Sequence, residues 1–241
     1  RKCRAFVFAR LTADSARARI IRRMDVWHVN LDLGPREIER EARVLDASEQ
    51  ARAARLRSPH LQRRFIAAHA ALRRILGERL HRPPASLSFW REASGRPRLM
   101  ADAPQGPGAA AALHFSLSHA GDHALVAVSE SADVGIDLEC DPAAEGLADD
   151  LQPQFAPEER AQLAGLHGAA RDRAACRCWV RKEALLKALG CGLAGDPARL
   201  AAVLVDQHPI QEQGDPGRRI DHGAANVAGG CFGAVRGRAA M

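Results

Sequence analysis

The feature that most constrains the fold of this chain is a short stretch in which apolar and acidic residues alternate. From Val134 to Glu139 the sequence reads Val-Gly-Ile-Asp-Leu-Glu. Side chains of a β-strand point alternately to its two faces, so the apolar residues share one face, and Asp137 and Glu139 share the other. Two neighbouring like charges beside an apolar hairpin cost free energy unless a cation neutralises them. The stretch therefore predicts a strand with a cation near its acidic face.

A later stretch, from Trp179 to Lys187, has the spacing of a helix. Trp179, Glu183 and Lys187 follow one another at intervals of four residues, which places them in one stripe of the helix surface. Taken alone, either stretch is more often a solvated face or a surface ion pair. Taken together, they offer three carboxylates and a lysine, which suit a magnesium ion beside a phosphate because Mg²⁺ prefers oxygen ligands. The two stretches predict phosphoryl-group chemistry.

The charge of the chain is concentrated at its beginning. The formal net charge is +6, but residues 1–23 contain eight Arg and Lys against the single acidic residue Asp14, so the remainder is close to neutral. The pI of about 9.4 therefore reflects this leader. Aromatic residues make up only 4% of the chain and Tyr is absent, which argues against the aromatic platforms on which single-stranded nucleic acid stacks. We expect no nucleic-acid partner.

Residues 1–23 form a basic leader that we expect to be disordered or foreign to the native protein. Its apolar piece, Ala5 to Ala9, is too short for a signal sequence and is interrupted by Arg10. Met24 stands immediately before the first strand-like run. Our hypothesis is that Met24 is the true start, and loss of folding or activity in a protein begun at Met24 would contradict it.

The six cysteines show no C-x₂-C pair of the kind that binds zinc and no framework of a secreted disulfide-rich domain. We interpret them as reduced thiols of a cytoplasmic protein. No apolar stretch approaches the ~20 residues that a membrane span requires, so no membrane partner is expected. The sequence signatures of P-loop, dinucleotide-binding and serine-hydrolase sites are absent as well.

Helical and strand-like stretches follow one another without strict alternation, which predicts an α+β fold. A connector rich in Pro, Gly and Ala, residues 101–112, marks the expected domain boundary. The predicted subdomains are residues 24–112 and residues 113–241. Strands are expected at 26–33, 86–90, 113–118, 124–129, 134–139, 200–206 and 231–235, and helices at 35–45, 49–57, 61–80, from 157 onward and at 171–189.

Four stretches in this order resemble a known family. They are Phe115-Ser116-Leu117-Ser118-His119, the run from Val134 to Glu139, Phe155-Ala156-Pro157-Glu158-Glu159, and the run from Trp179 to Lys187. The combination resembles the 4'-phosphopantetheinyl transferases, in particular the long Sfp-type monomeric class, over residues 26–192. The resemblance implies two similar α+β halves in a pseudo-twofold arrangement, with the active site in the cleft between them.

The reaction implied by the resemblance transfers the 4'-phosphopantetheine group of coenzyme A to a serine of an apo acyl, peptidyl or aryl carrier protein and releases 3',5'-ADP. Asp137, Glu139 and Glu183 would then hold Mg²⁺ on the pyrophosphate. Glu183 is also the candidate general base for the carrier serine, and Lys187 would stabilise the leaving phosphate. Trp179 is expected to pack beneath the site. The coenzyme A contacts of the family correspond here to Arg52, Arg55, Arg64, Arg96, Ser118 and His119.

Two other functions stay open on the sequence alone. Carboxylates with a nearby lysine also suit a metal-dependent phosphodiesterase or nuclease, although the near-neutral body of the chain argues against nucleic acid. A non-catalytic module that keeps the fold and docks carrier proteins is the third possibility. The chain departs from the family pattern at Glu49, where a basic nucleotide contact can occur, and it matches the family poorly after Gly192.

Overall fold

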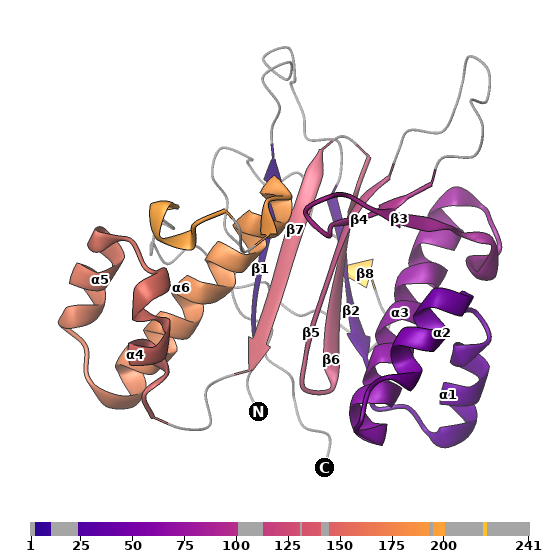
Figure 1. Ribbon diagram of the computed structural model, residues 1–241, viewed down its shortest axis with the longest axis horizontal. Helices are drawn as coiled ribbons and strands as arrows, with labels where there is room; N and C mark the ends of the chain where they lie inside the picture. The colour runs from indigo at the N-terminus through magenta and orange to yellow at the C-terminus, as the bar shows by residue number, and fades with distance from the viewer. Residues whose placement is uncertain are drawn as a thin grey trace.

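The computed structural model describes residues 3–10, 24–100, 113–130, 132–140, 145–192, 195–200 and 219–220 of the chain, the first and the last of these segments by their backbone only. Figure 1 shows a layer of strands between two groups of helices. In the part of the chain that the structure describes, no helix is both long and apolar enough to cross a membrane. The mixed architecture confirms the predicted α+β class.

The N-terminal part of the fold begins with strand β2 (Met24–Asn30), which is followed by the helices α1 (Pro35–Ala42), α2 (Ala47–Ala54) and α3 (Pro59–Leu80). The 3₁₀ turn η2 (Pro84–Ser86) leads into the short hairpin of β3 (Phe89–Arg91) and β4 (Pro97–Leu99). A second hairpin consists of β5 (His114–Ala120) and β6 (His123–Ser129). Antiparallel pairing gives a sheet with the order β5–β6–β2–β8, in which β8 is Arg219–Ile220.

The C-terminal part is built on strand β7 (Asp133–Cys140), which pairs antiparallel with strand β1 (Cys3–Arg10) in a separate sheet. The helices α4 (Leu147–Leu151), α5 (Pro157–Ala164) and α6 (Gly168–Leu189) follow, with the 3₁₀ turns η3 (Gln152–Gln154) and η5 (Pro197–Arg199). α6 packs along β7 and β1. In Figure 1 the helices α1 to α3 lie on one side of the strands and α4 to α6 on the other.

Local signals explain where several helices begin and end. Asp46 accepts a hydrogen bond from the backbone of Glu49 at 2.9 Å, and the Glu49 side chain accepts one from the backbone of Asp46 at 3.2 Å, which is a capping box for α2. Proline is the first residue of α3 and of α5, where its missing N–H would have no helical partner. α6 ends at Gly190, whose positive φ of 70° favours glycine.

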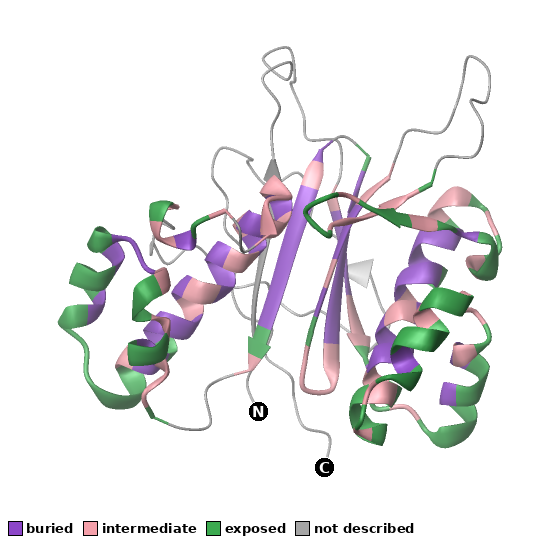
Figure 2. Cartoon of the chain, in the orientation of Figure 1, coloured by how far each residue is buried: buried purple, intermediate pink, exposed green. Residues whose placement is uncertain are grey.

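Strand β6 lies in the middle of the core and is buried on both faces. On one face Val126 and Val128 pack with Trp27 and with residues of α3. On the other face Leu125 and Ala127 pack with the β7 residues Val134, Ile136 and Leu138. Figure 2 shows the same burial on the strands and on the inner sides of α3 and α6. The apolar face of the alternating stretch is therefore a core face, as its period of two predicts.

Strands β5 and β7 lie side by side, although they belong to different sheets. The Ser116 hydroxyl accepts a hydrogen bond from the backbone N–H of Ile136 at 3.1 Å, and the Ser118 hydroxyl accepts one from the backbone N–H of Leu138 at 3.3 Å. Serine side chains thus act as acceptors for buried backbone donors of β7. The contact between β5 and β7 joins the two parts of the fold next to Asp137.

The structure differs from the expectation for the basic leader. Residues 3–10 form β1, and the register pairs Cys3 with Cys140 and Arg10 with Asp133. This strand differs from the expected disorder, because β7 offers it a backbone to pair with, and the alternative that the leader is foreign to the native protein stays a prediction. Residues 11–23 lie outside the described residues, and a start at Met24 stays a prediction. A protein begun there would lack the strand that borders β7.

The predicted boundary at residues 101–112 also differs from the strand pairing. Sequence analysis assigns the β5–β6 hairpin to the C-terminal subdomain, but both strands belong to the sheet of β2. A connector rich in Pro and Gly can link two strands of one subdomain as well as two subdomains, and composition alone does not separate these cases. The strands expected at 200–206 and 231–235 lie outside the described residues, apart from Leu200.

Candidate functional site

Asp137 projects from β7 toward α6, on the face opposite the apolar core. Lys187 Nζ donates to Asp137 Oδ1 at 2.5 Å and to Ser118 Oγ at 3.2 Å, and Ser118 Oγ donates to the same Oδ1 at 2.8 Å. Asp137 and Ser118 are buried, whereas Lys187 is partly exposed. Three elements, β5, β7 and α6, thus bring a serine, an aspartate and a lysine into mutual contact.

Gly135 allows α6 to lie this close to β7. A Cβ atom at this position would lie 2.0 Å from the carbonyl oxygen of Ala184 and 2.3 Å from the backbone nitrogen of Ala188, which is closer than non-bonded atoms approach. Gly135 shares its strand face with Asp137. The glycine of the alternating stretch therefore sets the distance between Asp137 and the helix that carries Lys187. Sequence analysis did not identify this role.

The acidic groups around Asp137 repel one another. Burial raises the pKa of Glu183 above the usual range of a carboxyl group, Lys187 opposes this shift, and the charge of Asp137 adds to it. Burial likewise raises the pKa of Glu139, and the charge of Asp137 raises this pKa further. One lysine faces three carboxylates here, so the site favours a further positive charge.

A divalent cation would supply that charge. Asp137 Oδ2 is buried and has no hydrogen-bond partner among the described residues, which is costly for a carboxylate oxygen unless a donor or a cation meets it. Within the same residues, no three His, Cys, Asp or Glu side chains converge into a ready metal-binding cluster. Asp137 therefore fits a cation ligand, and Glu139 and Glu183 are the carboxylates whose charges are coupled to it.

A cavity of about 520 Å³ opens beside Lys187 where the two parts of the fold meet. Its lining includes Glu183 and Lys187 of α6, Arg52 of α2 and His69 of α3. A second cavity of about 530 Å³ is lined by residues that include Arg64 and Glu139. His119 lines both cavities, so the two adjoin at this residue of β5.

Positive charges converge on His119. Burial lowers the pKa of His119, and the charges of His69, Lys187, Arg64 and Arg52 lower it further. Basic side chains line the first cavity together with the carboxylates of Asp46, Glu49 and Glu183. Arginine and lysine side chains suit phosphate oxygens in particular. The arrangement therefore favours a ligand that carries phosphate groups.

Two family models match adjoining stretches of the chain. One, described as 4'-phosphopantetheinyl transferase, N-terminal, matches residues 34–131, and the other, described as the 4'-phosphopantetheinyl transferase superfamily, matches residues 133–221. The 4'-phosphopantetheinyl transferase HetI of Nostoc sp. is 35% identical over 169 residues, which are 70% of this chain and 69% of that protein. The chain belongs to the 4'-phosphopantetheinyl transferase superfamily.

A second relative agrees with this assignment. A protein of Synechocystis sp. that carries a provisional name as a 4'-phosphopantetheinyl transferase is 31% identical over 152 residues, which are 63% of this chain and 59% of that protein. The predicted family and enzyme class are thus confirmed, and the phosphodiesterase and the non-catalytic module are not supported. The two family models meet between β6 and β7, in agreement with the strand pairing and not with the connector at residues 101–112.

Three predicted coenzyme A contacts of the transferase have different surroundings. Arg52 lines the first cavity, and its guanidinium lies 5.4 Å from the centre of the Phe65 ring. Arg64 lines the second cavity and donates to Asp122 Oδ1 from Nε at 2.9 Å and from Nη2 at 2.7 Å. Arg55 is exposed at the C-cap of α2 and lines neither cavity. The structure brings Arg52 and Arg64 to the site but leaves Arg55 outside it.

Ser118 was predicted to contact coenzyme A, but its hydroxyl contacts protein groups. It donates to Asp137 and accepts from Lys187 and from the backbone of Leu138. The serine of β5 that lines the first cavity is Ser116. The structure therefore assigns Ser118 to the positioning of Asp137 and Lys187, and a direct contact with coenzyme A stays a prediction.

Two arginines of the β3–β4 hairpin reach the C-terminal part of the transferase. Arg96 lines the first cavity, but its Nη1 donates to the carbonyl of Ala188 and its Nη2 to the carbonyl of Val134, both at 3.0 Å. Arg98 pairs with both carboxylate oxygens of Asp133. These bonds hold the hairpin against the end of α6 and the start of β7. Arg96 is therefore at least a positioning residue, and its predicted phosphate contact stays a prediction.

We expect Asp133→Asn to remove a pH-dependent part of the free energy of unfolding. Burial alone would raise the pKa of Asp133, but hydrogen bonds from Arg98 and His114 lower it from 3.8 to about 2. A carboxyl group with a lower pKa in the folded state stabilises the fold above its unfolded pKa, and this contribution is lost as the pH falls through both values. The free energy of unfolding of the variant should be about 2 kcal/mol lower than that of the wild type at neutral pH. Near pH ~2 the two proteins should hardly differ.

Urea unfolding of both proteins at neutral and acidic pH measures this difference. Asp149→Asn is the matched control, because Asp149 is 66% exposed and forms a surface pair with Arg171. A loss of stability in Asp133→Asn that is the same at both pH values would contradict the assigned ion pair.

The transferase contains a further buried ion pair, at a position that sequence analysis left without a role. Glu159 accepts from Lys182 Nζ at 2.6 Å and from the backbone of Ala156 at 2.7 Å, and Lys182 also donates to the carbonyl of Pro197 at 2.7 Å. The pair ties α5, α6 and η5 together. Trp179 packs against the apolar cluster formed by residues of α4, α5 and α6, and its place beneath the site stays a prediction.

Proposed function

We propose that this transferase moves the 4'-phosphopantetheine group of coenzyme A onto a serine of an apo acyl, peptidyl or aryl carrier protein and releases 3',5'-ADP. The contact of Asp137 with Ser118 and Lys187 at the edge of the cavity is the observation that supports the proposal best. It places a lysine and a carboxylate, one buried oxygen of which has no partner among the described residues, beside a cavity whose lining includes arginine side chains. A metal-bound pyrophosphate requires that combination.

Asp137, Glu139 and Glu183 would hold Mg²⁺ in this reaction. The bound ion would neutralise charge on the pyrophosphate and on the carboxylates around it. The mutual repulsion of these carboxylates supports the role, because it is relieved when a cation lies among them.

Glu183 would accept the proton of the carrier serine. Its raised pKa makes the carboxylate a better base than an ordinary glutamate. The serine oxygen then bonds to the phosphorus that carries the pantetheine, the bond from this phosphorus to the bridging oxygen breaks, and 3',5'-ADP leaves. Lys187, which lines the same cavity, would stabilise the negative charge that develops on the leaving phosphate.

The two parts of the fold would be halves of a pseudo-twofold arrangement that meet between β6 and β7. Each part contains one helix of 22 residues, α3 or α6, that packs on its strands. In Figure 1 these two helices lie on opposite sides of the strand layer. We expect the transferase to act as a monomer, as the resemblance to the Sfp-type class implies.

The mass of an intact apo carrier protein after incubation with the transferase, coenzyme A and Mg²⁺ tests the proposal. We expect the carrier to gain the mass of one phosphopantetheinyl group. EDTA should abolish the gain, and a carrier whose acceptor serine is replaced by Ala should show none. Carriers of fatty-acid, polyketide and peptide synthases should all be tried. If the folded transferase modifies none of them, the proposed reaction is wrong.

A further inference from the structure

Two histidines are in direct contact where strands β2 and β6 lie side by side. His28 Nε2 lies 3.0 Å from His123 Nδ1, and the two ring centroids are 5.0 Å apart with an interplanar angle of 30°. His28 is part of β2, and His123 is the first residue of β6. A hydrogen bond between two imidazoles requires that at least one ring is neutral, because an imidazolium has no acceptor nitrogen. The proposed transfer reaction uses neither side chain.

Both rings lie at the edge of an apolar core. Residues two apart in a strand share a face, so His28 lies on the same face of β2 as Val26, and His123 on the same face of β6 as Leu125. Val26 and Leu125 are fully buried in one cluster with residues of β7. Water solvates an imidazolium poorly at such a place. Burial is accordingly the main cause that lowers the pKa of His28, and the charge of His123 is the second.

The surrounding charges do not compensate a second proton on the pair. The titratable and charged groups that line the second cavity with His123 are Arg64, His119, Asp122, Glu139 and Cys140. Asp122 already accepts two hydrogen bonds from Arg64 and lies 3.9 Å from His60. Glu139 alternates with the core-facing residues of β7 and projects from the other face of that strand. Arg64, which is positively charged, opposes a further positive charge.

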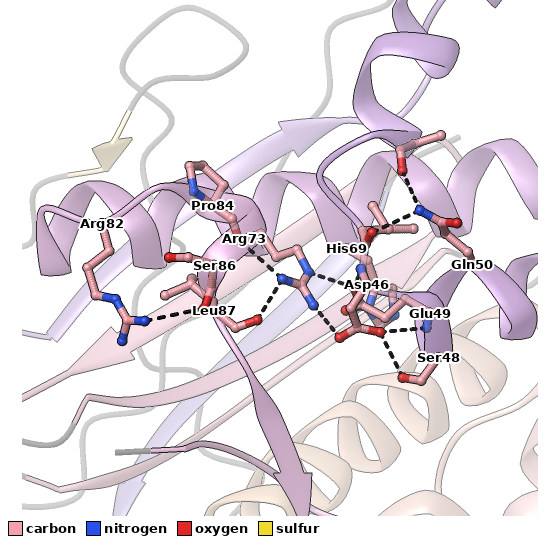
Figure 3. A network of polar contacts seen from close by, with 12 residues as sticks. Asp46, Ser48, Glu49, Gln50, His69, Arg73, Arg82, Pro84, Ser86 and Leu87 are labelled. Atoms are coloured by element: carbon pink, nitrogen blue, oxygen red, sulfur yellow. Dashed lines mark hydrogen bonds and ion pairs between the residues drawn. The ribbon is translucent and has the colours of Figure 1, made fainter. Parts of the chain in front are cut away.

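Figure 3 shows a histidine in the opposite situation. His69 Nδ1 lies 3.1 Å from Glu49 Oε1, so a carboxylate balances a proton on that ring. His28 faces a second imidazole instead. When the pH falls below the usual histidine pKa of about 6.5, the pair can hold one proton between its rings, but a second proton places two like charges in contact. The contact between His28 and His123 is therefore stable only while one ring stays neutral.

The pair helps to fix the turn between β5 and β6. In this turn the carbonyl of Asp122 accepts a hydrogen bond from the backbone of Leu31 at 2.8 Å, and the carboxylate of Asp122 holds the Arg64 side chain. His119 belongs to the end of β5, just before the turn. Arg64 and His119 line the second cavity together with Glu139. A displacement of the turn from β2 would therefore displace charged groups of this cavity.

We propose that His28 and His123 form a proton-sensitive latch, which holds the β5–β6 turn against β2 and opens when both rings carry a proton. Opening separates the rings and lets the turn move away from β2 with Asp122 and Arg64. Below pH ~6 the fold should therefore lose stability, and the second cavity should lose its arrangement of charges. The effect on stability is independent of the proposed function. Only the accompanying loss of phosphopantetheine transfer rests on it.

Urea unfolding at several pH values from ~8 to ~5, on either side of the usual histidine pKa, tests the latch. The unfolded chain takes up a proton that the folded pair excludes, so a falling pH shifts the equilibrium toward unfolding, by at most about tenfold per pH unit for one proton. We expect this shift to be smaller, by up to one proton, in His28→Gln, in which a neutral amide replaces one ring. His167→Gln is the matched control, because His167 is exposed and its side chain makes no capping hydrogen bond at α6. It should show the pH dependence of the wild type.

NMR titration of the histidine rings provides a second measurement. In the wild type, one ring of the pair should stay neutral well below the usual histidine pKa. In His123→Gln the remaining ring of His28 should take up its proton at a higher pH than in the wild type, because the repulsion between the rings is gone. If His28→Gln is poorly folded, His123→Gln replaces it in the unfolding measurements, since it removes the same pair.

Transfer to an apo carrier protein, measured at pH ~7.5 and at pH ~5.5, tests the link to the site. The ratio of the first rate to the second should be several-fold larger for the wild type than for His28→Gln. The same pH dependence of unfolding in the wild type and in both pair variants would overturn the latch. A changed pH dependence of unfolding with an unchanged ratio of rates would overturn its link to the second cavity. If the wild type modifies no carrier, the proposed function is wrong, while the unfolding and NMR data still decide on the latch.

Discussion

Asp137→Asn should lower the rate of phosphopantetheine transfer about a thousandfold while the protein stays folded. Asn keeps the volume of Asp and an acceptor oxygen for Lys187 and Ser118, which contact Oδ1 in the wild type. It removes the negative charge and replaces Oδ2, the buried oxygen without a partner among the described residues, by an amide group that does not bind cations. The loss should therefore fall on kcat and on the dependence on Mg²⁺.

The rate of mass gain of an apo carrier protein measures this effect at saturating coenzyme A, and thermal unfolding measures the integrity of the fold. Asp149→Asn, on the exposed surface of α4, removes the same charge away from the site and should leave the rate unchanged. A kcat of Asp137→Asn within a few-fold of the wild type would remove Asp137 from the proposed magnesium site.

Gly135→Ala should destabilise the fold by about 3 kcal/mol, at the upper end of what overpacking of a core costs. Its methyl group would overlap the backbone of α6 at Ala184 and Ala188, and backbone atoms cannot move aside as the end of a side chain can. α6 must then shift away from β7. Because Lys187 and Asp137 lie on these two elements, the shift should also lower kcat about a hundredfold.

Urea unfolding and the carrier assay measure the two consequences in the same preparation. Gly165→Ala is the control for the intrinsic difference between glycine and alanine. Gly165 has a negative φ, and no atom lies within 4 Å of the position of its added Cβ. It should be as stable and as active as the wild type. Wild-type stability of Gly135→Ala would show that α6 does not need the close approach.

Periodicity predicted most of the regular structure around the site. The alternating residues of β7 and the four-residue spacing along α6 were both placed in the correct element, because each pattern reports which side chains share a face. The pairing of β1 with β7 was not predicted. The sequence of β1 is basic and short. Its main interaction is the ladder of backbone hydrogen bonds with β7, which depends little on the side-chain pattern.

The residues of the candidate site could likewise be predicted only in part. Asp137, Glu183 and Lys187 could be identified from the sequence because their residue types and spacing suit a metal and a phosphate. His69 could not, since a single histidine in a helix has no pattern that separates a cavity-lining residue from a core residue. Its ring contacts Glu49, twenty residues away in the chain. Ser118 was identified as a ligand contact, which stays a prediction, and the structure adds its hydrogen bonds to Asp137 and Lys187.

By itself, the sequence determined the family, the α+β class and the faces on which the carboxylates and the lysine lie. Only the tertiary structure decided which faces meet. Lys187 contacts Asp137 across 50 residues and Ser118 across 69 residues of chain, and Gly135 matters because α6 happens to cross β7 at that point. The physical reason is that a periodic pattern specifies the direction of a side chain relative to its own element. The element that lies opposite is selected by packing of the whole core.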